Sequence, residues 1–187
     1  RAELGWSSRQ GAVVQPWTVP EEVVEHYARL RFTIHADCAV VGAKLALEDA
    51  NLASVTLNGE SVPVQLDGWF VDKSIRALAL PALREGVNAL EITLPITRRD
   101  GLEWCYLLGD FGVDIMGTHR VLTTRREKLG FSDWAHQRLP HYTGNMTYRI
   151  PVKTQGGKLR VTAPHYRGAA IRVALDGQHQ GYIVYAP

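Results

Sequence analysis

The stretch Arg29-Leu30-Arg31-Phe32-Thr33-Ile34 decides the fold class, because polar and apolar side chains alternate along it. A period of two places successive side chains on opposite faces of a β-strand, so that one face contacts a core and the other meets water. The same alternation returns at residues 44–48, 54–57, 89–94, 158–162 and 171–175. The sequence therefore predicts an all-β protein.

Short turn signals separate these runs. Asn58-Gly59 and Asp176-Gly177 directly follow a predicted strand and are typical of the tight turn of a β-hairpin. Further turn signals are Asp67-Gly68, Glu85-Gly86 and Gly156-Gly157. Helical periodicity is limited to residues 20–27 and 124–129, which are too short to form the core of a fold. Many short strands at regular spacing predict a β-sandwich.

The pattern occurs twice along the chain. In the first copy an aromatic strand with Phe32 leads, through a second strand, to a strand that ends on Asn58-Gly59; in the second copy Tyr148 leads similarly to Asp176-Gly177. The first copy closes with a strand that begins at Gly86-Val87-Asn88, and the second copy has no counterpart. Such self-similarity indicates two related structural units.

We therefore expect an N-terminal extension over residues 1–19 and two consecutive sandwiches, over 20–117 and 118–187, of which the second lacks its last strands. An incomplete sandwich has an open sheet edge, which favours pairing with another copy of the chain. The chain has no initiator Met and no targeting segment, so we expect it to be a piece of a longer protein of unassigned compartment.

Composition excludes several functional classes. The 187 residues are 45% hydrophobic and 21% charged, as in globular proteins, and the net charge is +2. That charge is too small to indicate a nucleic-acid or membrane partner. No apolar run approaches the ~20 residues of a membrane-spanning helix. The basic cluster at 120–128 is interrupted by Glu127 and is interpreted as a solvated connector.

Two segments carry a resemblance to a known family. They are Tyr142-Thr143-Gly144-Asn145-Met146-Thr147-Tyr148 and Arg167-Gly168-Ala169-Ala170-Ile171-Arg172-Val173-Ala174-Leu175-Asp176-Gly177. With them, the chain resembles the galactose-binding-like jelly rolls of glycoside hydrolases, such as the sugar-binding domain of family 2 and the C-terminal modules of rhamnosidase-like enzymes. The segment 102–113 is similar to the link between two such sandwiches in bacterial glycosidase-like proteins.

The resemblance implies two jelly-roll sandwiches that form a non-catalytic carbohydrate-binding or accessory region of a larger glycoside hydrolase. The family's catalytic carboxylates lie in a separate barrel domain, so the expected partners are a carbohydrate and the catalytic domain of the same parent chain. Some jelly rolls bind sugars and others act as spacers, so the fold alone does not show which of these two roles the chain has.

Sugar recognition needs an aromatic face for the apolar side of a pyranose and polar side chains for its hydroxyls. Aromatic and hydrogen-bonding residues gather in two loop-like stretches, and the candidate ligand-binding residues are Trp134, His141, Tyr142, His165, Tyr166 and Arg167. Trp134 and Tyr166 are the aromatic residues that we expect to be exposed, because both lie in loop-like polar sequence. The alternative is a purely structural or interaction domain without a ligand, in which every Trp is buried.

A glycosidase in its own right is the third hypothesis, and it requires two close carboxylates in a cleft. Glu103, Asp110 and Asp114 share one segment, but the last two are too far apart at strand spacing and are interpreted as turn-making or ion-pairing residues. We predict no catalytic residue.

The sequence also predicts no metal site and no cofactor. The seven histidines follow no ligand motif. A structural Ca²⁺ is the alternative that related jelly rolls offer, although no dense acidic loop supplies its ligands. Cys38 and Cys105 are interpreted as small buried apolar residues, and a single disulfide between them is the alternative.

Overall fold

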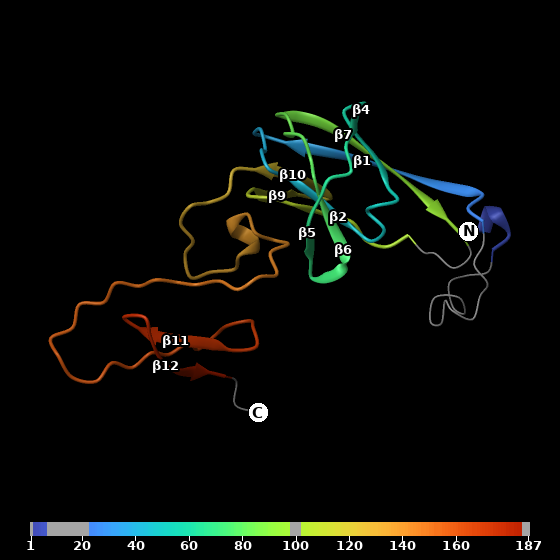
Figure 1. Cartoon of the computed structure of the whole chain (residues 1–187). Coiled ribbons are helices and arrows are strands. Elements are labelled where there is room, and N and C mark those ends of the chain that lie inside the picture. The colour runs from blue at the N-terminus through green and yellow to red at the C-terminus, as the bar shows by residue number, and fades with distance from the viewer. Residues whose placement is uncertain (1, 7–22, 98–101, 185–187) are drawn as a thin grey trace. The chain divides into compact units, whose positions relative to one another are not determined.

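A computed structural model gives the fold and describes residues 2–6, 23–97 and 102–184. The chain divides into two compact units, Arg1–Gly144 (unit 1) and Asn145–Pro187 (unit 2). Figure 1 shows the elements: η1 (Ala2–Leu4), β1 (His26–Ala36), β2 (Lys44–Leu47), β3 (Ser54–Leu57), β4 (Glu60–Val62), β5 (Leu66–Phe70), β6 (Asp72–Ala79), β7 (Gly86–Ile96), β8 (Tyr106–Leu108), β9 (Gly112–Met116), β10 (His119–Thr123), η3 (Ala135–Gln137), β11 (Ile171–Leu175) and β12 (Gln178–Ile183). The described residues thus form an all-β protein with two single-turn 3₁₀ helices, as the alternation predicts.

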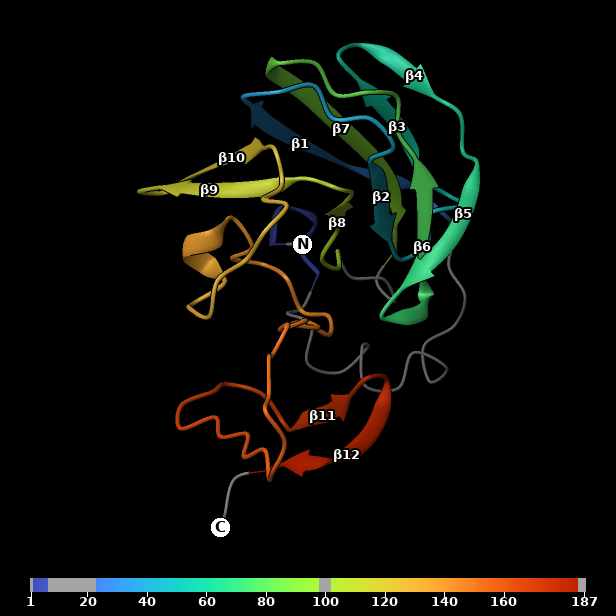
Figure 2. The ribbon, with the colours of Figure 1, turned by 90° about the vertical axis from the view of Figure 1, so that its left-hand side faces the viewer.

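Unit 1 contains two sheets that face each other (Figure 2). The larger sheet has the strand order β4-β3-β7-β1-β10-β9, and the smaller sheet has the order β5-β6-β2-β8. All neighbouring strands are antiparallel except β1 and β10, which pair in parallel. Unit 1 is therefore β-sandwich-like.

The alternation of β1 explains its place in the sandwich. Leu30 pairs with Ile92 of β7, and both pack into the core between the sheets. The next residue, Arg31, pairs with Glu91 on the opposite face, where Nε and Oε1 lie 2.9 Å apart in an exposed ion pair. The core draws side chains from both sheets, among them Leu45, Leu47, Val55, Leu57, Leu78, Leu90 and Ile92.

The predicted turn at Asn58-Gly59 joins β3 to β4. Both residues have positive φ, 54° and 85°, which is the signature of the type I′ hairpin turn. Asp67-Gly68 lies instead inside β5, where the ladder to β6 shifts register. That signal therefore marks a strand irregularity, and the turn expected there is not formed.

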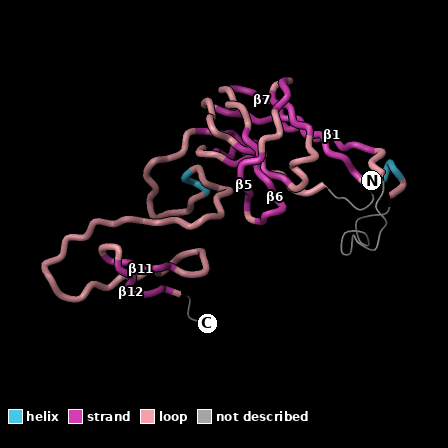
Figure 3. The backbone as a smooth tube through the Cα atoms, in the orientation of Figure 1, coloured by secondary structure: helices cyan, strands magenta, loops and turns pink. Residues whose placement is uncertain are grey.

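Unit 2 has one hairpin, β11–β12, within its described residues. Its turn, Asp176-Gly177, has φ values of 50° and 83°, so the two units share the same turn type. The strand predicted over 158–162 is not formed, and Figure 3 shows loop from residue 145 to the start of β11. Its apolar residues alternate, but no described strand pairs with them, and Leu159 and Val161 stay exposed.

The two units also divide at a different point from the expected residues 117 and 118. Gly117 lies in the turn of the β9–β10 hairpin, and β10 pairs with β1. Residues 118–144 belong to unit 1, because they include β10, which is a strand of its larger sheet. Of the extension expected over 1–19, only residues 2–6 lie within the described residues.

Candidate functional site

The six predicted ligand-binding residues belong to two units. Trp134, His141 and Tyr142 lie in unit 1, in the segment that follows β10. His165, Tyr166 and Arg167 lie in unit 2, in the loop before β11. The structure therefore describes two separate groups of candidates.

Trp134 and Tyr142 form an aromatic corner in unit 1. Their ring centroids are 6.0 Å apart and the rings are inclined at 70°, an edge-to-face arrangement. The backbone folds back between them, since Leu139 N–H donates to the Trp134 carbonyl at 3.0 Å and Tyr142 N–H donates to the Leu139 carbonyl at 3.3 Å. His141 is exposed beside Tyr142. We call Trp134, His141 and Tyr142 the aromatic corner.

Gly144 explains the Tyr-x-Gly spacing at this place. A Cβ at Gly144 would lie 2.6 Å from the Tyr142 hydroxyl oxygen, so only glycine leaves room for the ring in this position. The spacing that carried the family resemblance therefore has a local physical cause.

The buried side chain of Gln137 fixes the loop that carries Trp134. Its Oε1 accepts a hydrogen bond from Gly130 N–H at 2.7 Å, and its Nε2 donates to the carbonyls of Gly130 and Ser132 at 3.1 and 3.2 Å. One buried amide thus satisfies three backbone groups, which holds residues 130–137 in one conformation.

Arg138 ties this loop to the sandwich. Its Nε lies 3.3 Å from Asp114 Oδ2 of β9, and its Nη1 donates to the Thr124 carbonyl at 3.1 Å. In return Val113 N–H donates to the Arg138 carbonyl at 2.8 Å. The aromatic corner therefore stands on a braced loop beside β9.

In unit 2, Tyr166 has a structural contact. Its hydroxyl donates to the Ile183 carbonyl of β12 at 3.1 Å, which holds the preceding loop against the hairpin. His165 and Arg167 on either side are exposed. Tyr166 thus orients two exposed polar neighbours.

The expectation that Trp134 and Tyr166 are exposed is wrong. Both are half-buried, whereas Trp104 is 80% exposed and Trp69 is 55% exposed. Trp134 contacts Tyr142 within a folded loop, and Tyr166 contacts β12. Each of these contacts lies within one unit, and the polarity of the surrounding sequence does not reveal it.

The acidic residues considered for glycoside hydrolysis have different surroundings. Asp110 pairs with Arg125, Oδ1 to Nε at 2.6 Å, and Asp114 pairs with Arg138. The interpretation of these two as ion-pairing residues is confirmed. Glu103 lies elsewhere, at a cavity in unit 1.

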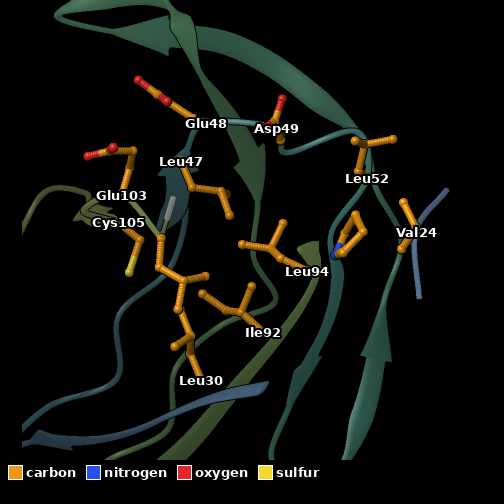
Figure 4. A pocket seen from close by; sticks show the side chains of 12 residues that line it. Val24, Leu30, Leu47, Glu48, Asp49, Leu52, Ile92, Leu94, Glu103 and Cys105 are labelled. Carbon is orange, nitrogen blue, oxygen red and sulfur yellow. The ribbon is translucent and has the colours of Figure 1, made fainter. Parts of the chain in front are cut away.

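That cavity has a volume of about 180 Å³ and an apolar floor with carboxylates at its rim (Figure 4). It is lined by Val24, Leu30, Leu47, Glu48, Asp49, Leu52, Ile92, Leu94, Pro95, Leu102, Glu103 and Cys105. The three acidic residues come from the end of β2 and from the segment before β8, which are far apart in the sequence. Spacing along the chain gives no sign of such a site.

The cysteines do not form the alternative disulfide. Cys38 and Cys105 are both free thiols, half-buried and packed against the core of unit 1. Burial raises the pKa of the Cys105 thiol, which keeps it protonated at neutral pH. Sequence analysis also missed Gln137 and Arg138, because a polar residue in a polar loop carries no sign that it is buried or braced.

Among the described residues, no group of three or more His, Cys, Asp or Glu side chains is placed to hold a metal ion. In the same part of the chain, no helix has the length and apolar character that crossing a bilayer requires. No family model, curated protein or solved structure matches the chain.

Proposed function

We propose that this chain is a non-catalytic carbohydrate-binding region, of galactose-binding-like jelly-roll type, within a larger glycoside hydrolase. The observation that carries the proposal is the aromatic corner: two rings set edge to face beside an exposed histidine, on a loop held by the buried Gln137. The β-sandwich-like fold of unit 1 is compatible with that family.

The chemistry of the corner suits a sugar. An aromatic ring offers a flat apolar face to the C–H groups of a pyranose, and the His141 imidazole can donate and accept hydrogen bonds with its hydroxyls. The loop is already ordered by Gln137 and Arg138, so binding does not have to fix it. In unit 2, His165 and Arg167 are exposed to bind a further polar group.

The second role in the proposal is contact with the catalytic domain of the parent chain. A purely structural, ligand-free domain would bury every Trp, but Trp69 and Trp104 are exposed. Exposed Trp side chains are typical of surfaces that bind a partner or a ligand. These two residues are therefore the proposed accessory contacts of unit 1.

Retention of the chain in gels that contain soluble polysaccharides tests the proposal. We expect at least one polysaccharide to retard the chain, Trp134→Ala and His141→Ala to abolish the retardation, and Trp104→Ala to leave it unchanged. His141 is exposed, so its variant tests binding without loosening the loop. Retardation that survives both Trp134→Ala and Tyr166→Ala would refute the assigned residues, and no retardation on any glycan would refute the function.

A further inference from the structure

We infer that the cavity of unit 1 binds a primary ammonium group carried on a short aliphatic chain. The inference is independent of the proposed carbohydrate function, because the cavity shares no residue with the aromatic corner. It rests on the floor, the rim and the hydrogen-bonding character of the lining.

The floor of the cavity is aliphatic. Leu47 of β2, and Ile92 and Leu94 of β7, line it together with Leu30 of β1 (Figure 4). The same side chains pack against the core between the two sheets, so the floor is rigid. None of the described residues that line the cavity is aromatic. An alkyl chain therefore suits this floor better than the flat face of a sugar does.

The rim of the cavity is acidic. Glu48 and Asp49, which directly follow β2, stand at the upper edge in Figure 4, and Glu103 stands beside them. Glu48 and Asp49 form no ion pair with any residue that the structure describes, and the described residues of the lining include no Lys, Arg or His. The negative charges of Glu48 and Asp49 are therefore available to a cation from outside.

The polar side chains of the lining also select the ligand by hydrogen bonding. Ionised carboxylates only accept, and an ammonium group only donates, so the two are complementary. A carboxylate ligand would be repelled, and an alcohol would gain no charge–charge attraction. The volume of about 180 Å³ holds a chain of roughly six carbons but not a folded peptide.

Binding of three matched six-carbon probes to the full chain tests the inference. We expect n-hexylammonium to shift the NMR methyl signals of Leu47 and Ile92, at a Kd about tenfold or more below those of 1-hexanol and hexanoate. Added salt should reduce this difference in Kd between the probes, because it screens exposed charges. Equal binding of all three probes, or shifts only at residues outside the cavity, would overturn the inference.

Neutral variants of the rim give the matched control. Glu48→Gln and Asp49→Asn remove charge with little change in shape, and asparagine tolerates the positive φ of 53° at position 49. Each should raise the Kd for n-hexylammonium severalfold, whereas Glu60→Gln, on β4 and away from the cavity, should leave it unchanged. An unchanged Kd in both rim variants would overturn the inference.

Cys105 provides a second readout that needs no assignment of signals. In a Cys38→Ser background, its thiol should react faster with the cationic 2-aminoethyl methanethiosulfonate than with the anionic sulfonatoethyl reagent, after correction by the rates of a free thiol. The thiolate sulfur forms a disulfide with the reagent and displaces methanesulfinate. A corrected ratio of one, or a ratio that survives Glu48→Gln with Asp49→Asn, would contradict the rim's role.

A lysine presented by a protein and a free amine share this chemistry. Nα-acetyl-lysine methylamide, which keeps the side chain next to peptide bonds, separates the two sources. If this probe binds as tightly as n-hexylammonium, the ligand is a lysine side chain. If only n-hexylammonium binds, the ligand is a free amine. If neither probe binds, the inference is wrong.

Discussion

Asn88 is completely buried in the sandwich of unit 1 and every polar atom of its side chain is paired. Its Oδ1 accepts hydrogen bonds from Arg84 N–H and Asn58 Nδ2, both at 3.0 Å, and its Nδ2 donates to the Arg84 carbonyl at 2.8 Å. Asn58 Oδ1 in turn accepts from Ala89 N–H at 2.9 Å. The β3–β4 turn and the start of β7 are thereby joined through two amides.

We predict that Asn88→Ala lowers the free energy of unfolding by about 2–3 kcal/mol, because it leaves buried backbone and amide groups without partners. Urea titration measures the loss. The matched control is Asn51→Ala at an exposed site, which should change stability by less than about 0.5 kcal/mol. Equal effects of the two substitutions would show that the network contributes nothing.

Burial raises the thiol pKa of Cys105. The contribution of the neutral thiol to the free energy of unfolding is fully present below the ordinary thiol pKa of about 8.5. It is lost as the pH rises through the pKa of the thiol in the folded chain. In a Cys38→Ser background, iodoacetamide should therefore alkylate the folded chain with a higher pH midpoint than the chain in urea. Coincident midpoints would mean that Cys105 is solvated.

Two aromatic side chains of the smaller sheet contact each other. Phe70 on β5 and Tyr106 on β8 come from its two edge strands, yet their ring centroids are 5.0 Å apart. Ala46 and Ala77 pair on the strands between them and are buried although they are not part of the core. Ala46 also pairs with Tyr106, so both share that face. We infer that the rings meet over the two alanines.

This arrangement predicts that Ala46→Leu destabilises the chain by about 1–3 kcal/mol, because the larger side chain forces the rings apart. Thermal unfolding monitored by near-ultraviolet circular dichroism measures the change and reports on the rings directly. Ala39→Leu, at an exposed loop position, is the control and should have little effect. If Ala46→Leu is tolerated equally well, the rings do not cover Ala46.

The strands of unit 1 could be predicted from the sequence because their signal is local. Alternation predicted the strands around Leu30, Val55 and Leu90. The turn at residues 58 and 59 was predictable because its positive φ angles favour Asn-Gly. The stretch at 158–162 has the same alternation and is not a strand, because a strand also needs a neighbour to pair with. Pairing partners are distant in sequence, and alternation does not specify them.

The candidate site was predictable only in part, for the same reason. Trp134 and Tyr142 lie close enough in the sequence for a loop to bring them together. The ion pair between Arg138 and Asp114 depends on which strand lies beside the loop. That Glu48 and Glu103 line the same cavity depends likewise on how the strands are arranged. These contacts follow from the tertiary fold.

At the scale of the whole molecule, the β11–β12 hairpin of unit 2 has two strands, each with one neighbour among the described residues. A two-stranded sheet is marginally stable in water and its edges can pair with another chain. We predict that the chain forms dimers through this hairpin as its concentration rises. Light scattering after size-exclusion chromatography measures the fraction of dimer.

Two matched variants test where the dimer forms. Tyr182→Lys places a charge on β12 and should raise the dimer Kd about tenfold or more, whereas Tyr27→Lys, at an exposed position of β1 in unit 1, should not. A monomer at every concentration would rule out the open edge as a site of self-association.

The sharpest test of the carbohydrate proposal follows the indole N–H signals of the five Trp residues by NMR during titration with the most retarding glycan. We predict that the Trp134 signal shifts until the glycan saturates the chain and that it does not shift in His141→Ala, while the Trp104 signal stays in place. A glycan that moves other indole signals and leaves Trp134 unchanged would contradict it.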